Sequence, residues 1–551
     1  MADGDGRSTD EGTRGDLRWG TIPGLLADAV ARRGPAEAVV DLTDPDRGRF
    51  SFDELDARVA ATARGMLAAG VRTGDAVAIW APNCWEWVVV LLALQSVGGV
   101  LVPLNTRYKG REAADILRRS RARLLFTVEG FLGNDYVSML RDPEVGDTPH
   151  LEQVVLLRTT GDVPDGVLTS EQFVAAGDAV DPAEVAARTA SLTGDATSDL
   201  LFTSGTTGHP KGVVQTHAQT LRAFGDWSDV VGLRETDRYL VINPFFHAFG
   251  YKAGILASLM AGATIVPLAV FDVDAAMATI EAEQISMIPG PPTLYQTILG
   301  HPAFDPAKVG SLRLAVTGAA VVPVELVHQM RDVLGFETVI TGYGLTEACG
   351  VATMCRHDDD PGTIARTSGR AIPGVLVEVV DPEGNEVPRG EPGEVVVSGY
   401  NVMKGYFEEP EQTAETIDAA GRLHTGDVGV MDERGYLRIT DRMKDMFIVG
   451  GFNAYPAEIE QLLLAHPDVA QAAVVGVPDE RMGEVGYAFV VAVPGASPDP
   501  AEVVEWARGA MANYKAPRFV EVVDALPLNA SGKVLKFELR QRAAATVGGG
   551  A

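Results

Sequence analysis

Lysine and cysteine are scarce in this chain of 551 residues. The nine lysines are at positions 109, 211, 252, 308, 404, 444, 515, 533 and 536, so arginine supplies most of the positive charge. The three cysteines, Cys84, Cys349 and Cys355, show neither a CxxC pair nor the ligand spacing of a zinc site. The N-terminal residues also lack the apolar stretch of a secretory signal peptide. These absences argue against a disulfide scaffold or a zinc motif, and we expect a cytoplasmic protein.

Positive charge is the second shortage. The formal net charge is −29, so the chain lacks the basic surface that binding to nucleic acid or to an anionic membrane requires. A polyanionic ligand would have to be held by a few local donors. The sequence therefore predicts small-molecule partners and no nucleic-acid partner. It leaves the oligomeric state open, a homodimer included.

A long uninterrupted apolar run is absent as well. The most apolar stretch, residues 87–104, is broken by Gln95, Ser96, Gly98, Gly99 and Pro103, so it falls short of a membrane span. We expect a buried helix that leads into a strand, and no integral membrane segment.

The chain is long enough for several domain cores, with 46% hydrophobic and 22% charged residues. From about residue 19 to residue 342, helical periodicity alternates with short Val, Ile and Leu runs, which is typical of parallel sheets covered by helices. We predict an α/β fold whose large N-terminal domain spans residues 17–441. Strands are expected at 124–127, 199–203, 239–243, 264–267, 285–288, 312–317 and 338–341, and helices at 250–261, 272–283 and 323–333.

The pattern changes in the last third of the chain. Short alternating runs separated by turn sequences predict a small antiparallel sheet or β-barrel over about 374–440. A small mobile α+β domain is expected at 442–545, and residues 1–16 and 546–551 are expected to be disordered tails. Within the small domain we predict a hairpin over 446–451, helices at 456–465 and 500–511, and strands at 472–477 and 488–493.

One string of small residues has the chemistry of a phosphate loop. Residues 203–212, TSGTTGHPKG, follow a predicted strand, so their backbone N–H groups could wrap phosphate oxygens while Lys211 adds a cation. A flexible turn is the alternative. The string lacks the Gly-Lys-Ser/Thr ending of a Walker A sequence, and Gly532-Lys533 is followed by valine, so ordinary P-loop NTPase chemistry is disfavoured.

This string resembles the phosphate loop of the adenylate-forming superfamily, which includes acyl-CoA synthetases, firefly luciferase and the adenylation domains of peptide synthetases. Further motifs resemble those of the family in the same order: GYGLTE at 342–347, HTGD at 424–427, DRMKD at 441–445 and GK at 532–533. The resemblance covers nearly the whole chain apart from its tails. It implies an AMP-forming acid–thiol ligase that uses ATP, Mg²⁺ and coenzyme A.

The resemblance also implies roles for individual residues. Lys533 is the implied catalytic lysine, Thr346 a phosphate contact and Glu347 the Mg²⁺ ligand. Asp427 would bind the ribose hydroxyls, and Lys444 lies at a hinge about which the C-terminal domain rotates between two half-reactions. The implied nucleotide- and CoA-binding residues are Thr203, Ser204, Gly205, Thr206, Thr207, Gly208, His209, Pro210, Lys211, Gly318, Ala319, Ala320, Gly342, Tyr343, Gly344, Asp427, Arg442, Lys444, Gly450 and Gly451.

The acyl site is expected where residues 243–250 join a strand end to a helix. By the resemblance, His247 lies near the acyl carboxylate and belongs to the catalytic set. The implied pocket residues are Phe246, His247, Phe249, Gly250, Pro289 and Gly290.

Several of these assignments have structural alternatives. His247 could be a satisfied core histidine, Asp427 a turn aspartate, and Glu347 a carboxylate favoured by a helix N-terminus. Arg442 could form a surface ion pair. Residues 318–320, which follow a predicted strand, could form a tight turn instead of a seat for the adenine.

Together the motifs predict a carboxylic acid–CoA ligase. The stretch 243–267 resembles actinobacterial ligases that activate methylhexahydroindanedione propionate, a product of steroid ring degradation, so steroid or cholesterol catabolism is the expected setting. The alternatives are a medium-chain fatty or aryl acid CoA ligase and a free-standing adenylation enzyme that loads a carrier protein. A luciferase-like oxygenase would share every nucleotide motif. A catalytically silent nucleotide sensor would be expected to lack Lys533 or Glu347, and both are present.

Overall fold

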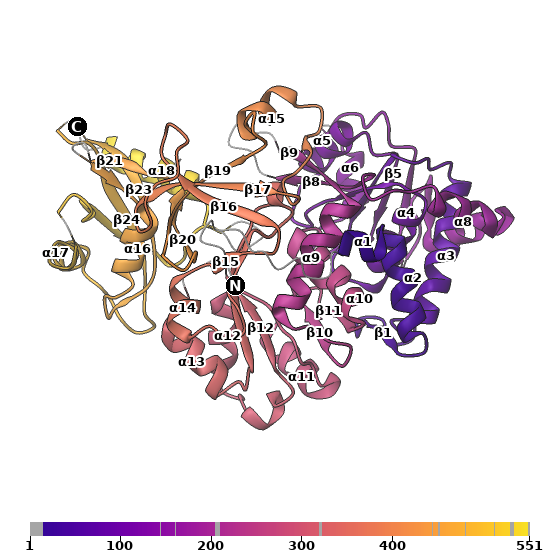
Figure 1. Cartoon of the computed structure of the whole chain (residues 1–551), viewed down its shortest axis with the longest axis horizontal. Coiled ribbons are helices and arrows are strands. Elements are labelled where there is room, and N and C mark those ends of the chain that lie inside the picture. The colour runs from indigo at the N-terminus through magenta and orange to yellow at the C-terminus, as the bar shows by residue number, and fades with distance from the viewer. Residues whose placement is uncertain are drawn as a thin grey trace. The chain divides into compact units, whose positions relative to one another are not determined.

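The computed structural model describes residues 15–143, 145–159, 161–203, 210–318, 322–442, 445–449, 452–479, 481–511, 513–528 and 534–548. The chain folds as two compact units (Figure 1). Unit 1 comprises Met1–Val377 and Val397–Leu423, and unit 2 comprises Glu378–Val396 and His424–Ala551. The predicted domain boundary at 441–442 falls within strand β20 (Leu437–Arg442) of unit 2 and stays a prediction. Among the described residues, no helix is long and apolar enough to cross a membrane.

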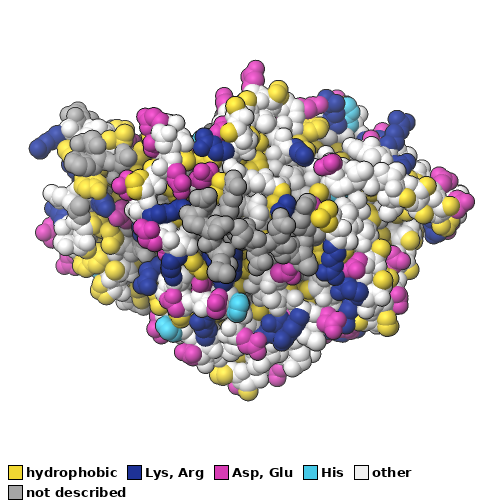
Figure 2. Space-filling model, in the orientation of Figure 1, with side chains coloured by type: hydrophobic (Ala, Val, Ile, Leu, Met, Phe, Trp, Pro, Cys, Tyr) yellow, Lys and Arg dark blue, Asp and Glu magenta, His cyan; other side chains and the backbone are white. Residues whose placement is uncertain are grey.

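Charged side chains of both signs are interspersed over the face drawn in Figure 2. Many form ion pairs, such as Arg123 with Asp75 and Glu152 at 2.5 and 2.6 Å. The chain has 75 acidic and 46 basic residues, so carboxylates remain in excess after pairing.

The largest sheet of unit 1 has eight strands in the order β18-β9-β8-β4-β3-β5-β6-β7. The six strands from β8 to β7 pair in parallel, which confirms the predicted parallel sheet. Strands β9 and β18 are antiparallel to their neighbours. The bounds are β3 (Ala76–Trp80), β4 (Val100–Pro103), β5 (Leu124–Thr127), β6 (Gln153–Leu156), β7 (Val167–Thr169), β8 (Thr197–Thr203), β9 (Lys211–Thr216) and β18 (Gly405–Tyr406).

The long apolar run forms a buried helix followed by a strand, as predicted. Helix α4 (Trp85–Ser96) is buried from Glu86 to Ser96, and β4 follows it. A helix that is apolar all round needs packing partners on every side. The other helices of unit 1 are α1 (Gly15–Trp19), α2 (Ile22–Arg33), α3 (Phe52–Ala68), α5 (Gly110–Ser120), α6 (Tyr136–Arg141), α7 (Ser170–Ala176), η1 (Gly177–Ala179), α8 (Pro182–Ala190), α9 (His217–Val231), η2 (Phe249–Leu256), α10 (Ala257–Ala261), α11 (Val273–Glu283), α12 (Pro292–Leu299), η3 (Pro306–Val309), α13 (Val324–Asp332), η4 (Thr346–Ala348), α14 (Pro361–Arg366) and α15 (Pro410–Thr416).

Two smaller sheets complete unit 1, in the orders β10-β11-β1-β2 and β12-β13-β14-β15. The continuous strand predicted at 285–288 is wrong, because only Met287 pairs there, through bridges to Tyr239 and Leu314. Prolines at 289, 291 and 292 remove the N–H donors that would extend the ladder. The bounds are β1 (Glu37–Val40), β2 (Arg49–Ser51), β10 (Arg238–Val241), β11 (Thr264–Pro267), β12 (Leu314–Thr317), β13 (Thr338–Tyr343), β14 (Thr353–Met354) and β15 (Arg370–Ala371).

Unit 2 contains most of a four-stranded sheet, β16-β17-β19-β20, in the region predicted at 374–440. It also contains a five-stranded sheet in which β22-β21-β24-β23 are neighbours and β25 pairs with β24. The remaining bounds are β16 (Val375–Val380), β17 (Pro392–Gly399), β19 (Leu423–Met431), β21 (Phe447–Val449), β22 (Phe452–Ala454), β23 (Val469–Asp479), β24 (Gly483–Ala492), β25 (Phe519–Val522), α16 (Pro456–Leu463), α17 (Pro500–Ala510) and α18 (Lys536–Gly548).

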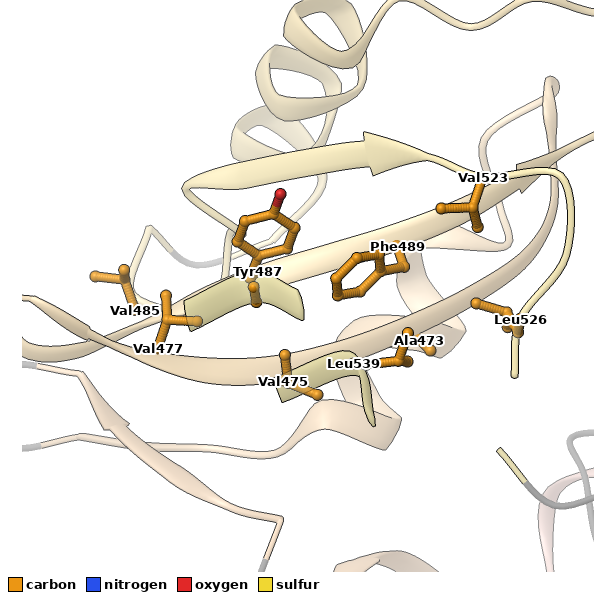
Figure 3. Packing of buried hydrophobic residues seen from close by; sticks show 10 residues of the cluster. Ala473, Val475, Val477, Val485, Tyr487, Phe489, Val523, Leu526 and Leu539 are labelled. Atoms are coloured by element: carbon orange, nitrogen blue, oxygen red, sulfur yellow. The ribbon is translucent and has the colours of Figure 1, made fainter. Parts of the chain in front are cut away.

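The five-stranded sheet has a core on each face, because successive strand side chains point to opposite sides. Val475 of β23 packs with Tyr487 and Phe489 of β24 on the face drawn in Figure 3. Val474 belongs to the other cluster, with Ile459 of α16. These clusters give unit 2 its own hydrophobic core.

The predicted tails are wrong at their inner edges. Helix α18 runs to Gly548, so residues 546–548 are helical, and α1 begins at Gly15. The alanine run at 543–545 favours helix, and Ala543 is fully buried. Residues 1–14 and 549–551 lie outside the described residues.

Candidate active site

Strands β8 and β9 form an antiparallel pair that frames the predicted phosphate loop. Thr203 ends β8 and lies opposite Lys211, the first residue of β9. The sequence analysis predicted β8 but not β9. The two adjacent valines, Val213 and Val214, are the residues that could have indicated this strand. Of the predicted loop residues, Ser204, Gly205, Thr206, Thr207, Gly208 and His209 lie outside the described residues. The two strands place Lys211 beside the end of the strand that leads into the loop.

Glu347 and Lys211 meet at a third residue, Tyr406. Oε1 of Glu347 accepts a 2.9 Å hydrogen bond from the Tyr406 hydroxyl, and Nζ of Lys211 lies 4.7 Å from the centroid of the Tyr406 ring. Burial, together with the neighbouring Glu347 carboxylate, raises the pKa of Tyr406, so its hydroxyl remains a donor. The backbone carbonyl of Glu347 accepts a 2.8 Å hydrogen bond from Met403 N. Because Glu347 lies in the three-residue turn η4, a helix dipole does not explain this carboxylate.

A buried polar network lies next to this turn. Nζ of Lys252 is 3.1 Å from Oδ1 of Asp199, and both side chains are 0% exposed. Lys252 also donates a hydrogen bond to Oε1 of Gln215, whose Nε2 donates to the carbonyl of Thr346. Buried charges are tolerated when they are paired and hydrogen-bonded. The network therefore links β8, β9 and η2 to the turn that carries Thr346 and Glu347.

The predicted acyl segment is held in place by Asn83, which the sequence did not single out. Nδ2 of Asn83 donates to the carbonyls of Val241 and Asn243, both at 3.0 Å, and its Oδ1 accepts from Phe245 N at 2.7 Å. A Cβ on Gly250 would lie 2.1 Å from the Pro244 carbonyl oxygen. The strand end and the first turn of η2 are thus tightly fixed.

His247 is not an enclosed core histidine. Its side chain is exposed, while its Nδ1 accepts a 3.2 Å hydrogen bond from Phe249 N. Desolvation by the surrounding protein nevertheless lowers the pKa of His247, so the ring is crowded by protein but keeps an accessible edge. The half-buried Phe249 contacts Trp227 of α9 edge to face, with ring centroids 6.0 Å apart. The neighbouring Phe246 is also half-buried.

The residues predicted near the adenine and those predicted as an acyl wall adjoin each other. Thr317 and Thr341 pair in the parallel strands β12 and β13, so Gly318, just after β12, and Gly342, within the last residues of β13, lie on adjacent strands. Gly290 N donates a 3.0 Å hydrogen bond to the carbonyl of Val316, and Gly290 bridges to Thr317. Gly342, Tyr343 and Gly344 retain solvent exposure, whereas Pro289 is buried. Ala319 and Ala320 lie outside the described residues.

Within unit 2, Asp427 lies inside strand β19 and pairs with Arg442 of β20 in the ladder. Asp427 is 4% exposed. Because Asp427 lies in a strand, it is not the turn aspartate that was the alternative from the sequence. The side chain of Arg442 is not among those that the structure describes. Lys444, Gly450, Gly451 and Lys533 also lie outside the described residues, and their roles stay predictions.

The donor set at Glu347 suits a metal that arrives with a nucleotide. Throughout the described ranges, no three or more His, Cys, Asp and Glu side chains gather to hold an ion. Mg²⁺ commonly uses one or two carboxylates, with phosphate oxygens and water completing its shell. The single, half-buried Glu347 carboxylate meets that requirement.

Comparisons with known proteins agree with the motifs. The family model "AMP-binding enzyme" matches residues 26–407, and "AMP-binding enzyme C-terminal domain" matches residues 458–533. A 3-[(3aS,4S,7aS)-7a-methyl-1,5-dioxo-octahydro-1H-inden-4-yl]propanoyl:CoA ligase of Mycobacterium tuberculosis is 49% identical over 96% of this chain and 99% of its own. The ligase of the same name from Rhodococcus jostii is 48% identical over 95% and 98%. ATP-bound MatB from Rhodopseudomonas palustris superposes with a TM-score of 0.82 at 31% identity, covering 95% of this chain and 99% of its own.

The chain belongs to the family of AMP-binding enzymes, which form adenylates. Within that family it is an AMP-forming acid–CoA ligase, which joins a carboxylic acid to CoA through an acyl-adenylate. The predicted fold, reaction and enzyme class are confirmed.

Proposed function

We propose that this ligase activates the propanoate of a methylated dioxo-octahydroindene in cytoplasmic steroid catabolism. The observation that carries the proposal is the 48 and 49% identity, over nearly the full length, to two ligases named for that acyl group. Feruloyl-CoA synthase of Amycolatopsis is 40% identical over 90% of this chain and 94% of its own. An aryl acid is therefore the second candidate.

The first half-reaction brings two anions together. At an effective dielectric near 20, like charges ~4 Å apart repel by ~4 kcal/mol, so cations must act before the carboxylate can attack the α-phosphorus. We assign Lys533 to the space between carboxylate and α-phosphate, and Lys211 with the loop to the leaving pyrophosphate. Thr346 would contact phosphate and Glu347 would hold Mg²⁺, which neutralises phosphate charge when bound. Asp427 would accept hydrogen bonds from the ribose hydroxyls, and Arg442 would lie near the ribose or phosphate.

The second half-reaction needs the CoA thiol at the acyl carbon, where Lys533 acted before. Rotation of the C-terminal domain about Lys444 would withdraw Lys533. It would bring Gly450 and Gly451 to the site, where they leave room for the pantetheine arm.

A panel of acids tests the substrate. Purified enzyme with ATP, Mg²⁺ and CoA is offered the indanedione propionate, octanoate and ferulate, while pyrophosphate release and acyl-CoA mass are followed. We expect kcat/KM for the bicyclic acid to exceed both others by roughly 100-fold, since a pocket matched to one ring system gains several kcal/mol in the transition state. Equal or faster turnover of octanoate or ferulate would overturn the substrate assignment.

Two variants test the assigned roles of the C-terminal residues. Lys533→Ala should lower acid-dependent pyrophosphate release by roughly 10²–10³-fold, as removal of one preorganised donor does, yet still convert supplied acyl-adenylate and CoA to acyl-CoA. Gly451→Trp should do the reverse, because the indole would fill the proposed thiol path. Each half-reaction is measured separately, by pyrophosphate release and by thioester formation. If both variants lose both steps, the two-state assignment is wrong.

A further inference from the structure

We propose that Tyr406 is a positioning residue that keeps the two opposite charges of the phosphate site apart and aimed. The Lys211 ammonium lies over the Tyr406 ring, and the Tyr406 hydroxyl donates a hydrogen bond to the Glu347 carboxylate. Both charged groups thereby remain available to ATP and its metal. This inference rests on the roles proposed above for Lys211 and Glu347.

The Tyr406 ring is fixed from several sides. In the ladder, Tyr406 lies opposite Val213 of β9, two residues beyond Lys211. Its backbone N donates a 2.9 Å hydrogen bond to Oγ1 of Thr413. The side chain packs with Val213 and Met403 and is 9% exposed. The backbone pairing and the packing restrain the ring, so that it can serve as a reference point for both Lys211 and Glu347.

Within the described part of the chain, this arrangement leaves both charges without an ion-pair partner. Lys211 lies over the Tyr406 ring and Glu347 accepts from its hydroxyl, and neither forms an ion pair with another described residue. A direct Lys211–Glu347 pair would neutralise both groups and would have to break before phosphate and metal could bind. A cation–π contact and a hydrogen bond from a neutral hydroxyl hold the side chains without cancelling their charges.

Two substitutions separate the two contacts. Tyr406→Phe keeps the ring under Lys211 and removes only the hydroxyl, which donates to Glu347 and also contacts Thr416. Tyr406→Leu removes the ring as well and lets Lys211 approach Glu347. Tyr136→Phe is the matched control, because Tyr136 of α6 is also buried, donates one 2.7 Å hydrogen bond to the Thr106 carbonyl and stacks on Trp80. Tyr136→Phe therefore removes one buried hydrogen bond that lies away from the site.

The measurements are ATP affinity by calorimetry in EDTA, the Mg²⁺ concentration for half-maximal pyrophosphate release, and KM for the acid. Tyr406→Leu should weaken metal-free ATP binding about tenfold, since the cation–π contact is replaced by a competing ion pair. Tyr406→Phe should leave that affinity unchanged but raise the half-saturating Mg²⁺ concentration about threefold, because Glu347 loses its orienting donor. KM for the acid should stay constant in both variants, and Tyr136→Phe should change none of these values.

Unchanged metal-free ATP affinity in Tyr406→Leu would overturn the inference. So would a lower Mg²⁺ requirement in Tyr406→Phe, or an equal rise in KM for ATP and acid, which marks a general structural defect. If the wild-type enzyme itself neither binds ATP nor releases pyrophosphate, it is the proposed function that fails.

Discussion

At the scale of the residue, two glycines near the predicted adenine site differ in what an added methyl group would meet. A Cβ on Gly318 would find its nearest neighbour, the carbonyl oxygen of Gly342, at 3.7 Å, which is ordinary contact. A Cβ on Gly344 would lie 2.2 Å from the carbonyl oxygen of Gly350 and 2.6 Å from Cα of Val351. Gly344 is thus required by the fold itself, whereas the structure gives Gly318 no such role.

This contrast makes a matched pair of variants. Gly344→Ala should lower the free energy of unfolding by about 2 kcal/mol or more, because backbone atoms must shift. Gly318→Ala should change it by less than about 0.5 kcal/mol. It should still raise KM for ATP about tenfold, because a methyl group would stand where the purine approaches. Urea unfolding and steady-state kinetics measure the two effects. An unchanged KM for ATP in Gly318→Ala would refute the adenine assignment.

Single residues were predictable where they belong to a contiguous motif, and unpredictable where a distant contact defines them. Glu347 and Lys211 stand in recognisable strings, but the Tyr406 hydroxyl reaches Glu347 across 59 positions. Lys252 reaches Cys349 and Asp199 only in the folded chain, with Cys349 Sγ 97 positions away at 3.6 Å. A local pattern carries no information about such partners, so the network beside the turn had no signal in the sequence.

At the scale of the element, helix α9 carries two buried groups whose titrations oppose each other. Nδ1 of His217 accepts a 3.2 Å hydrogen bond from Ile22 N, and burial lowers its pKa to about 4. Oδ2 of Asp226 accepts a 2.8 Å hydrogen bond from Tyr400, yet burial raises its pKa to about 6. Between pH 6.5 and about 4, His217 binds a proton only after unfolding, so its titration lowers the free energy of unfolding as the pH falls. Asp226 binds its proton at higher pH in the folded state than in the unfolded state. Its titration therefore lowers the free energy of unfolding as the pH rises from 3.8 to about 6.

We therefore expect the two slopes to offset each other in the wild-type protein. His217→Gln should leave the Asp226 effect alone, so that stability falls as pH rises from about 4 to about 6, by up to ~3 kcal/mol. Asp226→Asn should show the opposite trend over the same range and be more stable than wild type at pH 8, because it no longer buries a carboxylate. Urea unfolding followed across this pH range gives the comparison. Parallel pH profiles for the three proteins would contradict the assigned shifts.

Elements with a clear hydrophobic period were predicted, and those decided by tertiary structure were not. The parallel strands of unit 1 read as Val, Ile and Leu runs, because both faces of such a sheet are covered. The π-helix η2 shares its apolar residues with the α-helix that was expected at 250–261, so composition could not separate them. Helix α18 was missed, because polar residues and a glycine-rich end masked the few side chains, such as Leu539 and Ala543, that it buries.

At the scale of the whole molecule, the family motifs specify the chemistry, whereas the net charge affects how fast the substrates arrive. The matching family models cover residues 26–407 and 458–533, so the chemistry is specified along nearly the whole chain. The net charge of −29 is not part of any motif. It affects how fast polyanionic substrates arrive, since the summed field of a protein steers or repels charged ligands before contact.

Screening this field should therefore speed the capture of CoA, which carries several phosphate charges. Raising NaCl from about 10 to about 150 mM shortens the Debye length from ~30 to ~8 Å, which removes most of the long-range repulsion but little of the contact energy at a site. We expect kcat/KM for CoA to rise roughly twofold over this range, since steering effects of this kind fade with salt. The acid carries one charge, so its kcat/KM should change less, and sucrose at equal osmolarity should have no effect. A steady fall of kcat/KM for CoA with added salt would instead mean that a local basic site dominates the approach, despite the overall charge.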